Sequence, residues 1–567
     1  DGNYTATCTI NVVAKPTAES ASSFEYTATD TEVTITGYKG SNTQMVIPET
    51  IEGKSVTKIG SGSEVTGVES VTSVILPDTI VEIGNYAFRK NASIETIDLK
   101  NIKKIGAGAF EDCTTLKKIS FPEGITSIFT TAFAGCKELN CDIIIPDSVT
   151  TLGYGGTFEA CSKIKRVKLS KNCPTIPEGA FMESSLTGAL EFPEGVVSLE
   201  RNCFYKTNCT SVKFADSIKY IKFNAFRQSS KSLEGELVLP KNLEYWGDAL
   251  FDHARNLTNK TILIPKTLKK IGGDGYYSSW GDYMGSGNTG IGTHTFYDLA
   301  SYSLESFAVE EGNTAFKAID GVLYSIDGTR LVSYPCCKSA PDGVYEMPEG
   351  TKITDDLCFS LVSYPGISTS NVKTIKLPST FEISEYGKIN VSSGDGCKTF
   401  QSFNTLSGGL YIYNGIQAIE VSENNPNFKS INGCVYSKDG STLWYVPRYK
   451  KDALNIPEGT TKIAHGSFAG LYGACQTAIS SLNIPSSIKY IDEYTLPWIN
   501  KLSKGKITVD SGNPYWTLDD NGDIVEKEIS SIEISEVPTK TSYIQNSERL
   551  DITGGKIKIT NVDGQSY

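Results

Sequence analysis

The feature that most constrains the fold of this chain is a phenylalanine that returns every 22 to 25 residues. It closes a unit that begins with an aliphatic–x–aliphatic–Pro segment, as in "VILPDTIVEIGNYAF" (74–88) and "ISFPEGITSIFTTAF" (119–133). The recurring residues are Phe88, Phe110, Phe133, Phe158, Phe181, Phe204, Phe226 and Phe251. A unit of this length cannot bury its own apolar face. A regular series of such units is therefore typical of a solenoid, in which stacked neighbours share one continuous core.

A second position of each unit, three residues after the phenylalanine, is mostly small. It holds Asn91, Cys113, Cys136, Cys161, Ser184, Thr207, Ser229 and Ala254. A site that accepts cysteine, serine, threonine and alanine indicates inner packing, so we expect buried and unreactive thiols here. No CxxC pair occurs and the three histidines lie far apart in the sequence, so we expect no metal site.

The composition excludes several classes of function. A net charge of −12 disfavours binding to nucleic acid, which selects for basic surfaces. No apolar run approaches the ~18 residues of a membrane span, so we expect no membrane insertion in this segment. The common nucleotide-binding and hydrolase motifs do not occur in a supporting context. We therefore expect no cofactor, no catalytic residues and no enzymatic activity.

The repeated pattern resembles the BspA-like, or Treponema pallidum-type, leucine-rich repeat family, whose units read roughly LxxIxLPxxLxxIxxxAFxxC. The match recurs in register over about residues 24–500. The resemblance implies a leucine-rich repeat solenoid: a curved parallel β-sheet with short strands and irregular return segments. It also implies a bacterial cell-surface or secreted protein, since members of the family are mostly surface proteins and some are adhesins.

We expect this solenoid to extend over residues 24–528. Inside it, "FAVEEGNTAFKAIDGVLYSIDGTRLVSYP" (307–335) matches "IEVSENNPNFKSINGCVYSKDGSTLWYVP" (419–447), and 507–527 is a weaker third copy. Asp-Gly turns between alternating segments predict an inserted hairpin near each of these positions.

Both ends of the chain differ from the repeats. Residues 1–14 alternate like a sheet strand and resemble the last strand of a bacterial Ig-like domain, and 15–23 read as a polar linker. Residues 529–567 resemble the first half of a second Ig-like module. We therefore expect the solenoid to be flanked by Ig-like β-sandwich fragments.

One candidate binding element is the segment "DGYYSSWGDYMGSGNTGIG" (274–292). A regular unit passes from Gly106 to Phe110 in four residues, whereas here Gly272 stands 24 residues before Phe296. The insertion is thus a loop displayed on a rigid scaffold, where binding functions concentrate. Its aromatic residues could stack on sugar rings or anchor a protein partner, unless they fold back over neighbouring repeats. They are Tyr276, Tyr277, Trp280 and Tyr283.

A second candidate is the outward face of the strands. In "LKKISFP" (116–122) the strand period of two turns Ile119 and Phe121 inward and Lys118 and Ser120 outward. The corresponding charged residues of later repeats are Arg166, Lys168, Glu191 and Lys213. The sign of the charge changes along this face, which favours a protein or glycan partner over a polyanion. A solvated surface without a partner is the alternative.

These observations favour a non-catalytic adhesion module that binds surface proteins or glycans of a host or a neighbouring cell. One alternative is a passive stalk that spaces other modules apart. Another is a carbohydrate-active enzyme with a carboxylate pair.

Overall fold

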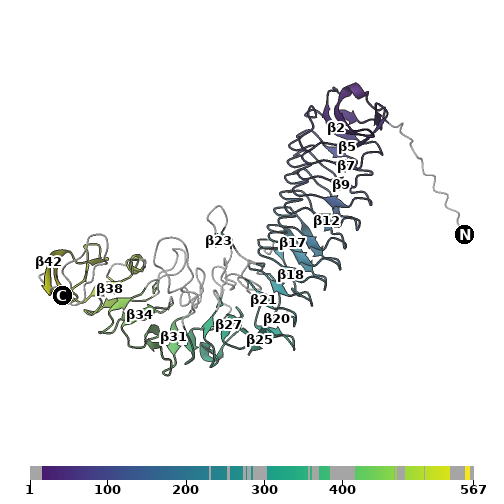
Figure 1. Cartoon of the computed structure of the whole chain (residues 1–567). Coiled ribbons are helices and arrows are strands. Elements are labelled where there is room, and N and C mark those ends of the chain that lie inside the picture. The colour runs from purple at the N-terminus through teal and green to yellow at the C-terminus, as the bar shows by residue number, and fades with distance from the viewer. Residues whose placement is uncertain are drawn as a thin grey trace, which may run out of the picture. The chain divides into compact units, whose positions relative to one another are not determined.

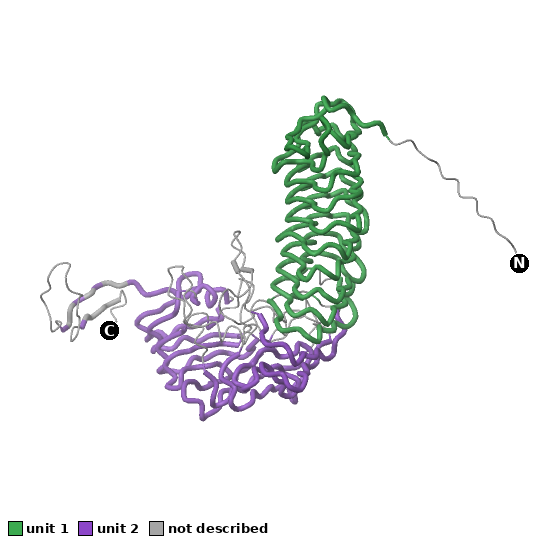
Figure 2. Tube along the Cα trace, turned by 45° about the vertical axis from the view of Figure 1, so that its right-hand side comes forward, with its two compact units in different colours: residues 1–256 green, residues 257–567 purple. Residues whose placement is uncertain are grey.

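The computed structural model describes residues 16–536 and 556–561 (Figure 1). The gaps within the first range are 229–231, 249, 252–253, 255, 273–275, 278–282, 285–302, 355–357, 360–369, 383–415, 448, 465–466, 469–478, 494 and 503–504. The chain divides into two compact units, residues 1–256 and 257–567 (Figure 2). In both units, short strands from successive repeats pair in parallel, which confirms the predicted solenoid.

Unit 1 begins with an antiparallel hairpin that leads into a parallel ladder, which we call the first ladder. A 3₁₀ turn (Ala21–Ser23) precedes β1 (Phe24–Ala28), which pairs with β2 (Glu32–Tyr38). β2 pairs in parallel with β5 (Lys54–Ile59). β4 (Thr50–Ile51) pairs with β5 in antiparallel fashion. The ladder continues with one strand per repeat. Parallel pairing joins β5 to β7 (Glu82–Ile83), β9 (Lys104–Ile105), β10 (Ser127–Ile128) and β12 (Thr151–Leu152). A separate sheet continues the row with β14 (Thr175–Ile176), β16 (Ser198–Leu199), β18 (Tyr220–Ile221) and β19 (Tyr245–Trp246).

The aliphatic–x–aliphatic segments form a second ladder in the same unit. Its strands are β3 (Gln44–Val46), β6 (Ser73–Ile75), β8 (Thr96–Ile97), β11 (Ile143–Ile144), β13 (Val167–Lys168), β15 (Thr187–Glu191) and β17 (Asn208–Lys213). Parallel pairing joins β3–β6–β8, β11–β13 and β15–β17, and an isolated bridge joins Thr96 to Lys118. Where proline soon follows the strand, as at Pro77 and Pro146, it limits the strand because it has no N–H to donate.

The recurring phenylalanines form one continuous spine through unit 1. Consecutive rings from Phe88 to Phe251 stack with centroids 5.2–5.6 Å apart and planes within 17° of parallel. Phe121 and Phe192 from the second ladder pack edge-on against this stack. All these rings are buried, so neighbouring repeats share a single core.

The segment that carries each phenylalanine has an unusual backbone, with two left-handed residues per repeat. Tyr86 and Lys90 have φ of 60° and 58°, and Gly108 and Asp112 repeat these values at 58° and 58°. Alternate N–H groups then point to the next repeat: Phe88 N donates to the carbonyl oxygen of Ala109 at 2.8 Å. This pattern gives the return segment its own row of bonds between repeats, although it is not a β-strand.

Unit 2 continues both kinds of strand. The aliphatic segments are β20 (Thr261–Ile264), β24 (Ser306–Val309), β28 (Val344–Glu346), β30 (Thr374–Leu377), β31 (Ala418–Val421), β35 (Leu454–Asn455), β37 (Leu482–Ile484) and β39 (Ile507–Val509). The strands of the other kind are β21 (Lys270–Ile271), β29 (Ile353–Thr354), β36 (Lys462–Ile463) and β38 (Tyr490–Ile491). Unit 2 also contains a 3₁₀ turn (Pro341–Gly343) and the short helix α2 (Leu496–Ile499).

Antiparallel hairpins occur in all three segments where the sequence predicts them. Two are three-stranded meanders: β25 (Phe316–Ile319), β26 (Val322–Ser325) and β27 (Arg330–Ser333), then β32 (Phe428–Ile431), β33 (Cys434–Ser437) and β34 (Thr442–Tyr445). The third is the pair β40 (Trp516–Leu518) and β41 (Ile524–Glu526). The last strands of the meanders, β27 and β34, pair in parallel with β29 and β36, so each of the two meanders extends a ladder of the solenoid.

A buried asparagine fastens each hairpin to the preceding repeat. Asn425 Nδ2 donates to the carbonyl oxygens of Pro378 and Phe381, and its Oδ1 accepts from the N–H groups of Asn427 and Phe428. Asn313 and Asn513 make the same four kinds of bond in the other two copies. The three copies therefore share a polar clasp as well as a sequence pattern.

The Ig-like modules predicted at the two ends of the chain stay predictions. Residues 1–14, with the predicted terminal strand, lie outside the described residues. Near the C-terminus, β42 (Ile529–Glu536) pairs in antiparallel fashion with β43 (Lys556–Asn561). A two-stranded pair is compatible with part of a sandwich but does not establish one.

Candidate functional site

The candidate surface is formed by the outward positions of the second ladder in unit 1, which we call the ribbon face. It comprises Thr96, Asp98, Lys118, Ser120, Asp142, Ile144, Arg166, Lys168, Ala189, Glu191, Ser211 and Lys213, and every one of these side chains is exposed. The residues between them, such as Ile97, Ile119 and Ile143, are buried. The structure thus places Lys118, Arg166, Lys168, Glu191 and Lys213 on one face, at the surface and in the predicted orientation.

The register determines which of these side chains are neighbours. Ile144 lies opposite Lys168 across β11 and β13, and Glu191 lies opposite Lys213 across β15 and β17. Paired strands are separated by ~4.8 Å, so side chains at matched positions stand side by side. Hydrogen bonds from Asn140 N to Lys117 O and from Thr187 N to Lys165 O link the remaining segments of the row.

Three large apolar residues in the described part of unit 1 are more than half exposed and are not among the predicted site residues: Ile144, Tyr154 and Val238, the last of them 72% exposed. Ile144 is 55% exposed on the ribbon face, and Tyr154 is 98% exposed on a turn. The signal for Ile144 is the "IIIP" segment (143–146), where strand alternation turns the middle isoleucine outward. The signal for Tyr154 is the "GYGG" segment, which makes the spacing from Leu152 to Phe158 one residue longer than that from Ile105 to Phe110.

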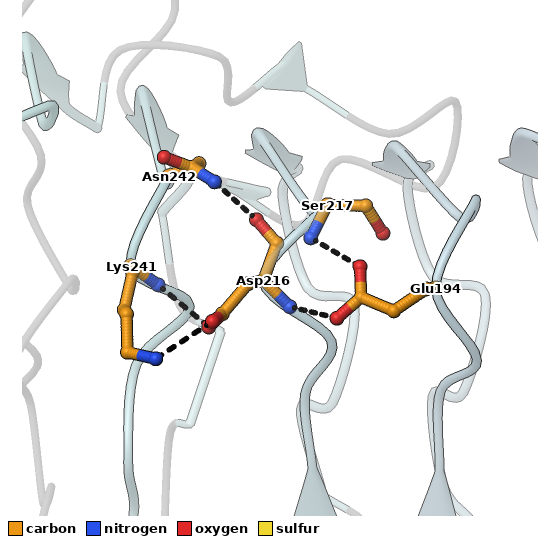
Figure 3. Close-up of polar contacts among 5 residues, drawn as sticks. All are labelled: Glu194, Asp216, Ser217, Lys241 and Asn242. Atoms are coloured by element: carbon orange, nitrogen blue, oxygen red, sulfur yellow. Dashed lines mark hydrogen bonds and ion pairs between the residues drawn. The ribbon is translucent and has the colours of Figure 1, made fainter.

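The turns that follow the second ladder carry a network of polar contacts between repeats (Figure 3). The Glu194 carboxylate accepts hydrogen bonds from the backbone N–H groups of Asp216 and Ser217 at 3.0 and 3.1 Å. The Asp216 carboxylate in turn accepts from Lys241 Nζ at 2.8 Å, and Asn242 Nδ2 donates to the Asp216 carbonyl oxygen. The hydrogen bond from Lys241 lowers the pKa of the Asp216 carboxyl. These groups are engaged in joining repeats, so we assign them a structural role.

The thiols of unit 1 are likewise structural. The Sγ atoms of Cys113, Cys136 and Cys161 donate to the carbonyl oxygens of the preceding repeats' phenylalanines, Phe88, Phe110 and Phe133, at 2.9–3.1 Å. Burial raises the pKa of Cys113, which keeps its thiol protonated and unreactive. Ser184 and Thr207 fill the same slot and donate to phenylalanine carbonyls of their own repeats. The predicted packing role is confirmed.

The aromatic insertion is described in part. β22 (Tyr276–Tyr277) pairs in antiparallel fashion with β23 (Tyr283–Met284), with Tyr277 opposite Tyr283. Three of the four predicted aromatic residues therefore lie on a two-stranded hairpin within the insertion. Trp280 lies outside the described residues. Ligand binding by these residues stays a prediction.

One half-buried acid of unit 1, Glu159, lies close enough to two other carboxylates to be affected by their charge. Burial raises the pKa of Glu159, and the carboxylates of Glu183 and Glu111 add to this shift. Both neighbours are held in ion pairs, Glu183 with Lys206 at 2.7 Å and Glu111 with Arg89 at 2.9 Å. Among the described residues, no group of three or more His, Cys, Asp or Glu side chains could hold a metal ion.

Comparison with known families identifies the repeats. Residues 38–165, 154–280 and 449–513 match the model of the BspA type leucine rich repeat region, in six copies. Together these segments make up more than half of the chain. No curated protein sequence matches the chain. In the part of the chain that the structure describes, no helix is both long enough and apolar enough to cross a bilayer.

Several solved structures are similar to the chain at low identity. A leucine-rich cell surface protein of Faecalibacterium prausnitzii is 20% identical over 88% of this chain and 96% of its own, with a TM-score of 0.33. A leucine-rich repeat protein of Eubacterium ventriosum is 15% identical over 89% and 98%, with a TM-score of 0.22. The T. pallidum leucine-rich repeat protein is 21% identical over 45% and 86%, with a TM-score of 0.21. Because these scores are low, the assignment of the repeats rests on the family model.

Proposed function

The chain belongs to the BspA-type leucine-rich repeat family, and from this premise we propose that it is a non-catalytic binding module on a bacterial cell surface or in the secreted fraction. Its ligands are proteins or glycans of a host or a neighbouring cell, bound through the ribbon face and the aromatic insertion. The location is supported by the family, whose members are mostly surface proteins.

The observation that carries the proposal is the ribbon face itself. Twelve exposed side chains, seven of them charged and of both signs, lie on or beside strands whose inner sides join one stacked core. Such a face is held in place by the core beneath it. Binding of a partner therefore costs little conformational entropy in this module.

The test is a binding array of extracellular matrix proteins and glycans probed with the full chain. We expect specific binding to a small set of ligands, weakened by Arg166→Glu together with Lys168→Glu or by Trp280→Ala. Effects of the first variant alone assign binding to the ribbon face, and effects of Trp280→Ala alone assign it to the insertion. Absence of binding across the array would contradict the proposal and favour a passive spacer.

A further inference from the structure

Most cations of unit 1 that lie away from the ribbon face are neutralised by acids of adjacent repeats. The pairs, with N···O distances of 2.5–3.7 Å, are Lys58–Glu82, Arg89–Glu111, Lys100–Asp78, Lys104–Glu82, Lys117–Glu95, Lys163–Glu138, Lys171–Asp147, Lys206–Glu183, Lys219–Glu244, Lys222–Glu200 and Lys241–Asp216. They lie on the first ladder, on the turns and on the return segments. Pairing between repeats is therefore the common state of a cation in this unit.

The cations of the ribbon face depart from this pattern. Lys118, Arg166, Lys168 and Lys213 are exposed, and none forms an ion pair with any residue that the structure describes. Lys168 contributes to the field that lowers the pKa of Asp147, but the ion pair of Asp147 is with Lys171 at 3.1 Å. A chain with net charge −12 thus presents on one face four cations that form no ion pair with a described residue, although Glu191 lies opposite Lys213.

An exposed aliphatic side chain lies among these cations. Ile144 stands directly opposite Lys168, and its strand lies between the segment that carries Lys118 and the strand of Arg166. More than half of its surface is open to water, which is unfavourable for an isoleucine unless a partner covers it. An apolar centre inside a polar rim is the usual arrangement of a protein–protein interface.

We propose that this part of the ribbon face, centred on Ile144 and bordered by Lys118, Arg166 and Lys168, binds an acidic protein segment that carries an aliphatic side chain. The inference rests on the proposed binding function and names the chemistry of the partner. The aliphatic side chain covers Ile144, and the carboxylates of the segment pair with the cations.

The composition of the face favours a protein over other anionic or sugar ligands. Asp142 and Glu191 interrupt the cations, so a uniform polyanion would meet repulsion at both positions. None of the twelve ribbon-face positions is aromatic, so no ring is present for a sugar to stack on. From the segment of Lys118 to the strand of Lys168 the proposed site crosses three segments, or ~10 Å at strand spacing, which matches about three residues of extended chain.

The experiment measures binding of the full chain to three synthetic peptides of twelve residues by fluorescence anisotropy. One contains leucine with aspartate and glutamate, a second replaces the acids by asparagine and glutamine, and a third replaces them by lysine. Dextran sulfate serves as the polyanion. We expect tightest binding of the acidic peptide, about tenfold weaker binding for Arg166→Glu with Lys168→Glu, and weaker binding for Ile144→Ser.

The matched control is Lys103→Glu with Lys137→Glu, because both lysines are exposed, lie off the ribbon face and form no ion pair with a described residue. It changes the net charge equally, so we expect it to retain most of the affinity. Equal loss in both double variants, equal binding of all three peptides, or binding of dextran sulfate alone would overturn the inference. If the ligand array binds wild type and Arg166→Glu with Lys168→Glu equally, the proposed function stands and this inference fails. If the array is silent, both fail.

Discussion

The thiol of Cys113 donates a hydrogen bond to the carbonyl oxygen of Phe88, 25 residues earlier in the chain and 2.9 Å away. The same contact recurs between Cys136 and Phe110. In these repeats the slot therefore holds a small hydrogen-bond donor beside the phenylalanine spine. This relationship explains why the position keeps a small polar side chain in several repeats.

We expect Cys113 to be protected from alkylation in the folded protein. Burial raises its pKa above the ordinary value of 9.0, so the reactive thiolate does not form near neutral pH. Iodoacetamide labelling followed by peptide mass spectrometry should modify Cys113 in urea and leave it unmodified without urea. Equal labelling rates in the two conditions would contradict the buried position.

The same shift predicts a loss of stability at alkaline pH. Below pH 9.0 the Cys113 thiol is protonated in both the folded and the unfolded chain, so its contribution to the free energy of unfolding is constant. Above this value the unfolded chain releases a proton that the folded chain retains, so the free energy of unfolding falls as pH rises. Urea midpoints measured from pH 7 to 10.5 should show a smaller decline for Cys113→Ser, whose hydroxyl does not titrate.

Removal of one ring from the spine should strongly destabilise unit 1. Phe133 is fully buried and stacks on Phe110 and Phe158 at 5.2 and 5.4 Å. Phe133→Ala is expected to cost about 3–5 kcal/mol, because the cavity would lie between two rings. Urea unfolding followed by circular dichroism should show a lower midpoint, with a smaller decrease for Phe133→Leu. An unchanged midpoint for the alanine variant would refute a shared spine.

The asparagine clasp should matter as much as an apolar core residue. Asn425→Ala would leave the carbonyl oxygens of Pro378 and Phe381 and two N–H groups without their partner. Unsatisfied buried polar groups make a loss of about 2–4 kcal/mol reasonable. The neighbouring Asn424 is exposed, so Asn424→Ala is the matched control and should change the thermal midpoint little. Equal effects of the two substitutions would argue against the clasp.

The turn network predicts a local effect on amide exchange. Glu194→Ala removes the acceptor for the N–H groups of Asp216 and Ser217, so hydrogen exchange at these two amides should become faster. Glu191→Ala, three residues away on the ribbon face, should leave the same amides unchanged. Unaltered exchange in the Glu194 variant would show that other groups protect this turn.

Several features of the fold could be predicted from the sequence for physical reasons. The period of the phenylalanines requires a shared core, and strand alternation correctly turned Lys118, Arg166, Lys168, Glu191 and Lys213 outward. The same alternation turns Ile144 outward. The left-handed residues of the return segments could not be predicted, since tyrosine, lysine and aspartate rarely adopt that conformation.

The sequence by itself determined the repeat, its buried and outward positions, and the family to which the chain belongs, because these depend on local periodicity. Only the tertiary structure decided which charges are neutralised. Lys241 reaches Asp216 across 25 residues of chain, whereas Lys168 faces Ile144 and pairs with no described acid. That difference arises from the register of neighbouring repeats and from the side-chain directions at their turns, which one-dimensional spacing does not contain.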